Sequence, residues 1–408
     1  MSSYAIIDVA HMFYRARHVV QGDAYTKAGM ALDIMFRSLR KVHREQKVDH
    51  MVLCVEGRSW RFDVYPQYKA KRRLERMSAT PAEQEEDNAF NEVLNDFVEF
   101  MKTKTRCTVL QSNKVEGDDF VARWIQLHPK DNHVIISGDS DYLQLLDHNV
   151  KIYNGVDDRL ITINGVFNSD GEHLYFKIDS SSGKVKVSGT VAEMRRKHDK
   201  DQRDKEKKHN AIERDRKKLF ETSEKTKAVL DPTYEPRHFV ASQYDWEEFT
   251  FEIEPEWWRK ALFVKLVRGD TGDGIFSSYP GVRYNGTKKT VGICEAWADR
   301  SAKGFDWNNF MLQKWSKMVG TDSNGNPISE SVRVLDEYKF NESLIDLTKQ
   351  PEEVKAIMDA VIVEAVQKEP VGNIGIHFMR FCAKHDLPRL SREASDYASF
   401  LNAPYARD

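Results

Sequence analysis

The sequence predicts an α/β fold built on a mostly parallel, doubly wound sheet. Three apolar runs of strand length each end in an acidic residue, at Asp8, Glu56 and Asp139. A segment with helical periodicity follows each run. Alternating strands and helices of this kind are typical of parallel sheets, whose ligand sites lie outside the carboxyl ends of the strands. Three strands that each deliver a carboxylate to that edge can converge on one place.

Composition limits the class of protein. The 408 residues are enough for two or three domains, and 40% hydrophobic with 11% aromatic residues favours a folded chain. The four cysteines are far apart and form no CxxC pair, which argues against structural zinc and against a disulfide framework. The sequence has no run of 18 apolar residues and no basic segment before its first strand. We therefore expect a cytoplasmic protein without a membrane span.

The strands are expected in "YAIIDVAH", "HMVLCVEG" and "HVIISGDSD", and in the last of these Asp141 follows Asp139 by two residues. A turn with an aspartate that caps a helix explains one such strand end without any function. Recurrence of the pattern at three strand ends favours a shared site.

Two further acidic groups stand at expected helix starts. In "VEGDDFVARW", Glu116 and Asp119 can share a helix face, with Asp118 beside them. In "VKLVRGDTGDGI", Asp270 and Asp273 have the same spacing in a glycine-rich turn. Acids near a helix N-terminus often only complement the helix dipole, so neither group alone predicts a site.

Together these positions form a set of nine carboxylates without a competing set of His or Cys ligands: Asp8, Glu56, Glu116, Asp118, Asp119, Asp139, Asp141, Asp270 and Asp273. So many acids in one cleft repel one another unless cations neutralise them. Oxygen ligands favour Mg²⁺ or Mn²⁺ over zinc. The set predicts a site for two divalent metal ions, which suits phosphoryl transfer.

A formal net charge of −2 hides a basic segment, "RSWRFDVYPQYKAKRRLERMS". Aromatic residues are interleaved there with seven cations, Arg58, Arg61, Lys69, Lys71, Arg72, Arg73 and Arg76. Such a mixture suits a phosphate backbone with exposed bases. An ordinary solvated helix is the alternative interpretation.

A second candidate phosphate site is the turn in "YPGVRYNGTKKTVGICEAW". Its phosphate donors could be the backbone N–H groups of Gly281, Val282 and Gly286 and the side chains of Lys288 and Lys289. Glycine-containing turns before helices are common, so this signal alone is weak.

Asp141 and Asp270 are 129 positions apart, and residues 165–255 lie between these acidic motifs. "HLYFKID" and "KVKVSG", joined by "SSSG", predict a β-hairpin. Residues 195–218 hold twelve Lys or Arg against six Asp or Glu and lack an apolar stripe. They predict a solvated helix or an arm, with DNA contact as the functional alternative. Beyond residue 300 we expect a helical bundle packed behind the 279–297 turn.

The motifs "IIDVAHMFYRA", "RFDVYPQYKAKR", "VEGDDFVA", "ISGDSDYLQLL" and "VRGDTGDGI…YPGVR…GTKKTV", in this order, resemble those of the 5′ nuclease family. That family comprises flap endonucleases, the 5′ nuclease domains of bacterial DNA polymerases and bacteriophage 5′ exonucleases, including phage RNase H. The resemblance covers about residues 4–160 and 256–300, and the phage branch is the most similar. It implies a PIN-like core with a helical arch, and a helix-three-turn-helix element that grips duplex DNA.

We therefore expect four parts: residues 1–164, a nuclease core with the arch; 165–255, a charged insertion; 256–330, the core completion and the helix-three-turn-helix element; and 331–408, a C-terminal helical region.

The resemblance also implies roles for single residues. The main metal cluster would be Asp8, Glu116, Asp118, Asp139 and Asp141, completed by Asp119, Asp270 and Asp273. Glu56 departs from the family's usual Asp, so its metal contact is the least secure. Lys69 and Arg72 would act on the scissile phosphate. Further DNA contacts would come from Tyr14, Arg15, Tyr68, Arg73 and the 281–289 turn.

The expected activity is that of a Mg²⁺-dependent 5′ to 3′ exonuclease or flap endonuclease with a two-metal mechanism, in which Mn²⁺ can substitute. Its substrates would be 5′ flaps, nicked or forked duplexes and RNA-primed duplexes in replication or repair. We expect a monomer, in the host cytoplasm if phage-encoded, with no membrane partner and with a single-strand-binding protein or polymerase clamp as companion.

Two alternatives belong to other classes. A non-catalytic, structure-specific DNA-binding protein is hinted at only by Glu56. A Mg²⁺-dependent phosphatase of small substrates would leave Lys69 and Arg72 without a role.

Overall fold

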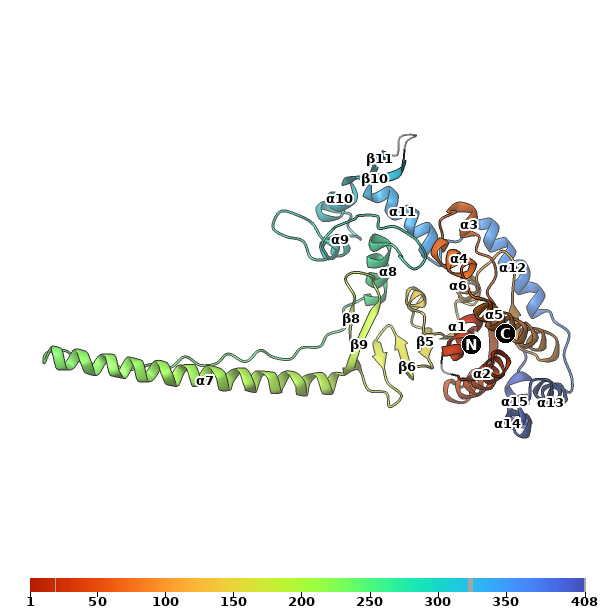
Figure 1. Cartoon of the computed structure of the whole chain (residues 1–408), viewed down its shortest axis with the longest axis horizontal. Coiled ribbons are helices and arrows are strands. Elements are labelled where there is room, and N and C mark those ends of the chain that lie inside the picture. The colour runs from red at the N-terminus through yellow and green to blue at the C-terminus, as the bar shows by residue number, and fades with distance from the viewer. Residues whose placement is uncertain (19, 322–325, 407–408) are drawn as a thin grey trace.

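The computed structural model describes residues 1–18, 20–321 and 326–406. A globular body carries one long helix, α7, that projects far from it (Figure 1). Three of the four expected parts include residues outside this description, namely residue 19, residues 322–325 and residues 407–408. The division of the chain at residues 164, 255 and 330 stays a prediction.

A seven-stranded sheet forms the centre of the body, in the order β3-β2-β1-β4-β5-β6-β7. Neighbouring strands are parallel from β3 to β5, and β6 and β7 add to the edge in antiparallel fashion. The predicted mostly parallel sheet is confirmed. The strands are β1 (Ser3–Asp8), β2 (His50–Cys54), β3 (Thr108–Leu110), β4 (Asn132–Ile136), β5 (Val150–Asn154), β6 (Arg159–Thr162) and β7 (Gly165–Phe167).

Helices pack on both faces of this sheet. Those of the first 150 residues are α1 (Val9–Tyr14), α2 (Ala24–Gln46), α3 (Arg61–Val64), α4 (Ala70–Met77), α5 (Pro81–Lys104) and α6 (Gly117–Leu127), with 3₁₀ turns at Arg15–His18 and Ser140–Leu145. Sequence fixes where they begin. At α5, for example, Thr80 and Glu83 form a capping box, and Pro81 occupies the first helical position. Proline is tolerated there because the backbone N–H that it lacks would have no acceptor within the helix.

Alternate residues of β1 point to opposite faces of the sheet. Ala5 and Ile7 join a core with α2 and α5, whereas Tyr4 and Ile6 join a second core with α6. Because both faces are covered, the central strands are apolar throughout, as the continuous runs in the sequence indicated.

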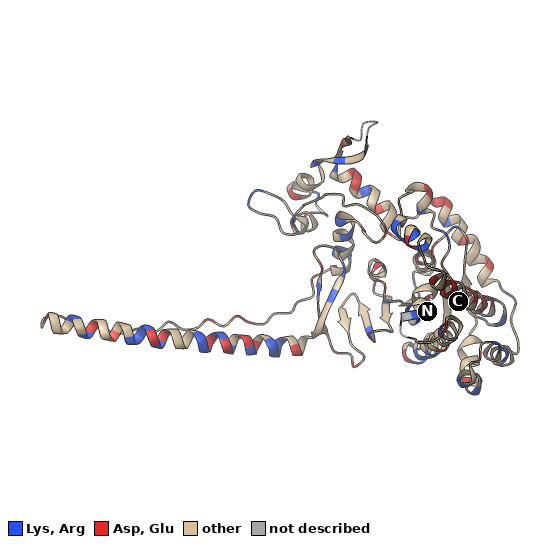
Figure 2. Ribbon diagram, in the orientation of Figure 1, with Lys and Arg blue, Asp and Glu red and all other residues tan. Residues whose placement is uncertain are grey.

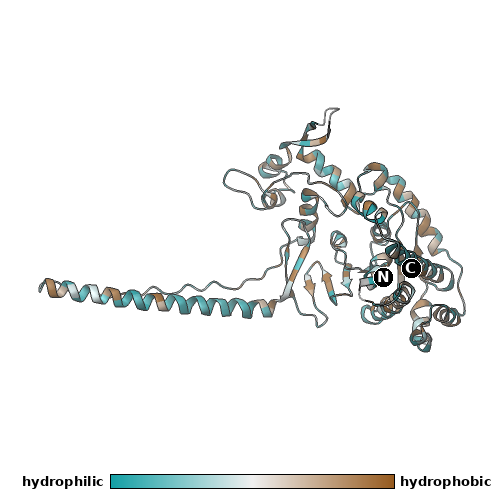
Figure 3. Ribbon diagram, viewed as in Figure 1, coloured by the Kyte–Doolittle hydropathy of each residue, from teal (hydrophilic) through white to brown (hydrophobic). Residues whose placement is uncertain are grey.

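The predicted hairpin is confirmed as β8 (Leu174–Ile178) and β9 (Val185–Thr190). It leads directly into α7 (Val191–Leu230), which begins at a capping box of Thr190 and Glu193. Residues 231–256 then return along the helix in an extended path (Figure 1). Most of α7 is hydrophilic (Figure 3), so the charged segment is a solvated helix, as expected.

The region after the arm contains α8 (Trp257–Arg268), α9 (Ile293–Ala298) and α10 (Phe305–Met311). A hairpin of β10 (Lys314–Thr321) and β11 (Pro327–Arg333) follows. The expectation of helices alone beyond residue 300 was therefore wrong. Both strands are largely polar, which gives little hydrophobic periodicity to detect. The hairpin is tied to the body by Trp315, whose Nε1–H donates to the Ser278 carbonyl oxygen at 2.9 Å.

The C-terminal helices are α11 (Val334–Ile345), α12 (Glu352–Val366), α13 (Ile374–Lys384), α14 (Pro388–Arg392) and α15 (Ala394–Leu401), which confirms a helical C-terminal region. They do not gather into one bundle behind the 279–297 turn, as was expected. α11 contacts α8, α12 packs on α6 and β3, and α13 and α15 pack on α5 and α2. An apolar helix face indicates burial but not the partner, so the sequence could not place them. Among the described residues, no helix has the length and apolarity that a bilayer crossing requires.

Candidate active site

The carboxyl edge of the sheet opens into a cavity of about 770 Å³. Because β1, β2 and β4 are parallel neighbours, the residues that follow them meet at this edge. The cavity is lined by four of the predicted acids, Asp8, Glu56, Asp118 and Asp139, and by the predicted cations Lys69 and Arg72. Residues of α4 and α5 form its other wall, where the arch was expected.

Asp8 and Asp139 are held by hydrogen bonds from neighbouring backbone amides, and Asp8 also by two hydroxyl groups from distant parts of the sequence. The Asp8 carboxylate caps α1 by accepting from the His11 N–H at 3.0 Å. Its other oxygen accepts from the hydroxyls of Ser137 and Tyr142, both at 3.1 Å. Asp139 accepts from the Asp141 N–H at 3.0 Å. The helix-cap role weighed in the sequence analysis is thus real, and it coexists with exposure to the cavity.

Glu116, Asp118 and Asp119 lie at the start of α6, and one carboxylate oxygen of each falls within 4.8 Å of the others. The loop after β2 passes very close to the loop that leads into this helix. A Cβ at Gly57 would lie 1.9 Å from the Ser112 carbonyl oxygen, so only glycine permits the approach. The Glu56 carboxylate accordingly accepts from the Gly117 N–H at 3.0 Å.

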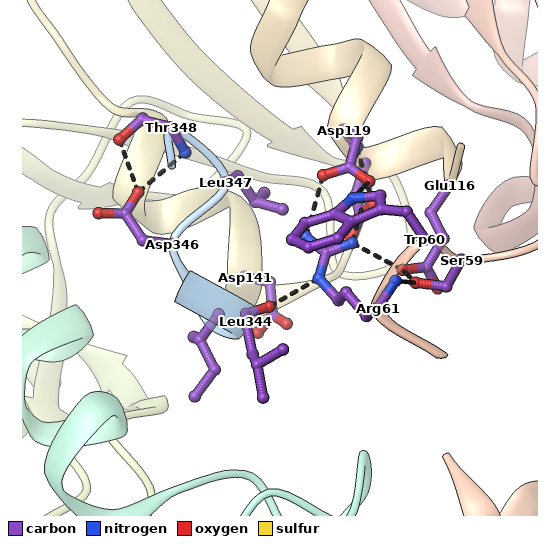
Figure 4. A network of polar contacts seen from close by, with 12 residues as sticks. Ser59, Trp60, Arg61, Glu116, Asp119, Asp141, Leu344, Asp346, Leu347 and Thr348 are labelled. Carbon is purple, nitrogen blue, oxygen red and sulfur yellow. Dashed lines mark hydrogen bonds and ion pairs between the residues drawn. The ribbon is translucent and has the colours of Figure 1, made fainter. Parts of the chain in front are cut away.

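Arg61 organises the acids beneath the cavity (Figure 4). Its guanidinium donates to Asp119 through both terminal nitrogens at 2.9 Å and to Glu116 at 2.8 Å. Its Nε–H donates to the Leu344 carbonyl oxygen at 2.7 Å, and the Trp60 Nε1–H reaches Asp119 at 2.9 Å. Arg61 is only 2% exposed and Asp119 0%. Counting Arg61 among the cations displayed to phosphate was wrong, because its charge is used inside the protein.

Lys69 and Tyr68 lie above this buried layer. The Lys69 ammonium pairs with Glu116 while lining the cavity, and its backbone adopts a left-handed conformation with φ of 50°. The Lys69 N–H is anchored on the Asp273 carbonyl oxygen at 2.8 Å. Tyr68, predicted to contact DNA, is 3% exposed, and its hydroxyl donates to Asp273 at 3.1 Å. Tyr68 therefore lies beneath the cavity wall. Arg72 is exposed and pairs with Asp273 at 3.1 Å.

A second group of acids is held by a lysine that the sequence analysis did not single out. Lys265 on α8 is nearly buried, and its ammonium lies 2.5 Å from Asp141 and 2.7 Å from Asp270. These two carboxylates outweigh the effect of burial and raise the pKa of Lys265, which keeps the ammonium charged. The available signal was a lysine within "VKLVRGD", one helical turn before the acidic motif.

The electrostatics of the cavity favour a bound cation. Although its side chain is exposed to the cavity, partial desolvation and the nearby Glu116 carboxylate raise the pKa of Glu56 to about 7. Burial and the charges of Asp119 and Glu116 hold the pKa of Asp118 well above its ordinary value. At Glu116 burial acts in the same sense, but Lys69 and Arg61 outweigh it and lower the pKa. The carboxyl groups of Glu56 and Asp118 thus lack enough positive charge from the protein nearby, whereas Lys69 and Arg61 supply it to Glu116.

The remaining predicted DNA contacts are spread over two places. Tyr14 lines the cavity with its hydroxyl 2.6 Å from Asn91 Oδ1, and Arg15 follows at the start of the 3₁₀ turn. Arg73 is exposed on α4 and donates to the Pro66 carbonyl oxygen at 2.6 Å.

The predicted phosphate turn lies between α8 and α9. Gly281, Lys288 and Lys289 are exposed there, and Val282 is half-buried. The Gly286 N–H already donates to both carboxylate oxygens of Glu295, at 3.0 and 2.9 Å. The structure therefore gives the Gly286 amide a structural partner, and the Val282 N–H donates to the Tyr279 carbonyl oxygen at 3.4 Å. The exposed Gly281 backbone and the two lysine side chains are the predicted groups most accessible to a phosphate.

Residues 3–171 match the family described as the 5′-3′ exonuclease, N-terminal resolvase-like domain. This part of the chain belongs to the 5′ nuclease family. The matched range contains β1 to β7 and the whole cavity edge of the sheet. The 5′ nuclease domain thus supplies Asp8, Glu56, Asp118 and Asp139, whereas Lys265, Asp270 and Asp273 come from outside it.

Two solved structures from bacteriophage T5 are similar to the chain that carries this 5′ nuclease domain. One is the 5′-exonuclease with bound zinc, at 15% identity, and the other is the flap endonuclease in a pseudo-enzyme–product complex with DNA and metal ions, at 14% identity. Each match covers 97% of this chain and 99% of the other, with a TM-score of 0.44.

Proposed function

We propose that the protein is a Mg²⁺-dependent 5′ nuclease that hydrolyses phosphodiesters at or near the 5′ end of flapped, nicked or RNA-primed duplex DNA. The family membership of residues 3–171 supports nuclease chemistry. The observation that carries the proposal is the cavity, which Asp8, Glu56, Asp118 and Asp139 line together with Lys69 and Arg72. Carboxylates opposite cations are what a phosphodiester and its metal ions require.

The donor set fits hard divalent cations. The acidic groups around the cavity offer carboxylate oxygens, and the raised pKa values of Glu56 and Asp118 reflect charge that a cation would relieve. Asp8, Glu56, Asp118 and Asp139 would hold the ions. Such ions lower the pKa of an attacking water and stabilise the leaving oxygen. Asp119 differs from the others, because Arg61 and Trp60 already engage both its oxygens.

The cations have distinct tasks in this proposal. Lys69 is fixed by Glu116 and by the anchored Lys69 N–H, so its ammonium can donate to a phosphoryl oxygen without first being ordered. Arg72 is more exposed and pairs with Asp273, which suits a group that moves onto the phosphate when DNA arrives. Lys265 keeps Asp141 and Asp270 in place at the edge of the site.

The proposal is tested with a 5′-labelled flap substrate, Mg²⁺ and an EDTA control. Wild-type protein should release a short 5′ product only with the metal. Asp118→Asn should lower the single-turnover rate by at least a hundredfold, because a ligand and its charge are lost. Asp63→Asn is the matched control, since Asp63 is an exposed acid paired with Arg58. Tight flap binding without cleavage under Mg²⁺ or Mn²⁺ would instead identify a non-catalytic DNA-binding protein.

A further inference from the structure

The arm is a two-part structure in which α7 and the extended segment 231–256 pair in register. Aromatic side chains of the helix meet aromatic side chains of the returning segment at regular intervals. The pairs are His198 with Phe249, His209 with Tyr244 and Phe220 with Phe239, with ring centroids 5.6, 5.7 and 5.7 Å apart. Successive partners are eleven residues apart in α7 and five residues apart, in the opposite direction, in the returning segment.

Polar residues repeat the same pattern. Gln202, Glu213 and Glu224 are again eleven residues apart, and although the helix is solvated they are only 1%, 6% and 3% exposed. Glu213 accepts from the Ser242 N–H at 3.0 Å, and Glu224 accepts from the Arg237 N–H at 2.9 Å. The two carboxylates thereby satisfy backbone amides of a segment that has no sheet partner in the described chain.

The two spacings agree because they cover the same length. Eleven helical residues rise about 16.5 Å, and five extended residues also span about 16.5 Å. Each repeat therefore meets an equivalent partner, and one face of α7 is held against the returning segment along most of its length. A helix with one face fixed in this way also has fixed directions for all its other side chains.

Seven cations occupy a single sector of the free surface, which we call the basic stripe: Arg196, Lys200, Arg203, Lys207, Arg214, Lys218 and Lys225. At about 100° per residue they fall within roughly 60° of the helix circumference, centred about 130° from the paired face. Glu221 is the one acid in that sector. All seven cations are exposed, and Figure 2 shows Lys and Arg along the length of α7.

Ion pairs do little to neutralise the basic stripe. Within the described residues, Lys207 is the only stripe cation with a carboxylate within 4 Å, and that contact to Asp204 is 3.4 Å long between two exposed side chains. The returning segment has the opposite charge, with eight Asp or Glu against one Arg over residues 231–256. The arm is therefore basic along one flank and acidic along its paired side.

We propose that the basic stripe binds the phosphate backbone of duplex DNA while the substrate occupies the nuclease cavity. The inference rests on the proposed function, since it assumes a DNA substrate. The stripe runs straight for about 43 Å, from Arg196 to Lys225. Duplex DNA is stiff over this distance, so a straight row of cations can follow it, and the acidic side of the arm excludes the opposite orientation.

The test compares two triple variants with equal loss of charge. Arg203→Gln, Lys207→Gln and Arg214→Gln together remove the centre of the basic stripe, and Lys197→Gln, Lys205→Gln and Lys208→Gln remove three cations from the rest of α7. Affinity for a 30-bp duplex and for a 30-nucleotide single strand is measured against salt in EDTA. The stripe variant should bind duplex at least tenfold more weakly, with a log-log salt slope shallower by about 2 to 3. The control should change less than threefold.

Equal losses in both variants would overturn the inference, because net charge alone would then explain binding. Unchanged duplex binding by the stripe variant would overturn it as well, and so would a loss confined to the single strand. The conservative variant Arg203→Lys, Lys207→Arg and Arg214→Lys should bind like wild type, and failure of this rescue counts against the inference. Cleavage is assayed separately with Mg²⁺: a wild type that binds duplex but never cleaves contradicts the proposed function and leaves the binding comparison intact.

Discussion

Charge is arranged differently beneath the cavity and along the arm. Beneath the cavity, Arg61 is almost fully buried and holds two carboxylates and a carbonyl oxygen in one geometry. Along α7 the cations of the basic stripe are exposed and repeat at regular intervals. A buried charge is costly to leave unpaired, whereas a single exposed ion pair contributes little. Removing one charged side chain should therefore lower the free energy of unfolding strongly beneath the cavity and hardly at all along the arm.

The largest effect on stability is expected for Arg61→Met. It leaves Asp119 buried without its counter-charge and Glu116 with Lys69 alone, which should cost about 3 to 5 kcal/mol of unfolding free energy. Urea denaturation of the metal-free protein measures this. Arg58→Met is the matched control, because Arg58 is exposed and pairs with the exposed Asp63, and it should cost less than about 1 kcal/mol. Similar losses for both variants would remove the distinction between the two regions.

Lys69→Ala should act mainly on the chemical step. We expect the single-turnover rate of flap cleavage to fall by about a hundredfold while DNA affinity changes less than about threefold, because in the proposed function the ammonium stabilises charge that develops in the transition state. Arg73→Ala serves as the comparison, since Arg73 is exposed one turn further along α4. If Lys69→Ala weakened binding as strongly as the rate, Lys69 would be a phosphate anchor instead.

Glu56 should make the metal-free protein sensitive to pH. Its folded pKa of about 7 lies above the ordinary 4.5, so the folded state keeps this proton longer than the unfolded chain. The associated stability is present below pH 4.5 and is lost as the pH rises to about 7. In EDTA, the melting temperature of wild type should fall across this window more than that of Glu56→Gln. Parallel curves would mean that Glu56 is solvated like a surface acid.

The smallest effect is expected in the arm. Glu213→Ala removes the acceptor for the Ser242 N–H, so residues around 242 should become more sensitive to limited proteolysis. The melting temperature of the body should change by less than about 2 °C, because this exchange lies far from both cores. Asp215→Ala changes an exposed acid two residues away and should leave both readouts unchanged. A large drop in the melting temperature would show that arm and body unfold together.

The sequence was most informative where a pattern belongs to one segment. Strand ends at Asp8 and Asp139 and the β8–β9 hairpin could be predicted from local periodicity, and the solvated character of α7 could be predicted from its charge composition. Arg61 was wrongly predicted to be exposed, because its neighbours in the sequence are those of a surface cation. Only the fold brings Glu116 and Asp119 next to it. The pairing of the arm was missed for a related reason. It joins an eleven-residue spacing in one segment to a five-residue spacing in another, and neither segment has an apolar stripe that would indicate a partner.

The commensurate pairing also restricts how the arm can change in evolution. Loss of residues 203–213 alone would set the distal aromatic side chains of α7 opposite the wrong partners, and loss of residues 240–244 alone would do the same from the other side. Loss of both together would shorten the arm by about 16.5 Å and leave the remaining pairs aligned. The pairs therefore stay aligned only when the arm loses or gains about sixteen residues at a time, eleven in the helix and five in the extended segment. Natural variants of this insertion should differ in length by whole steps.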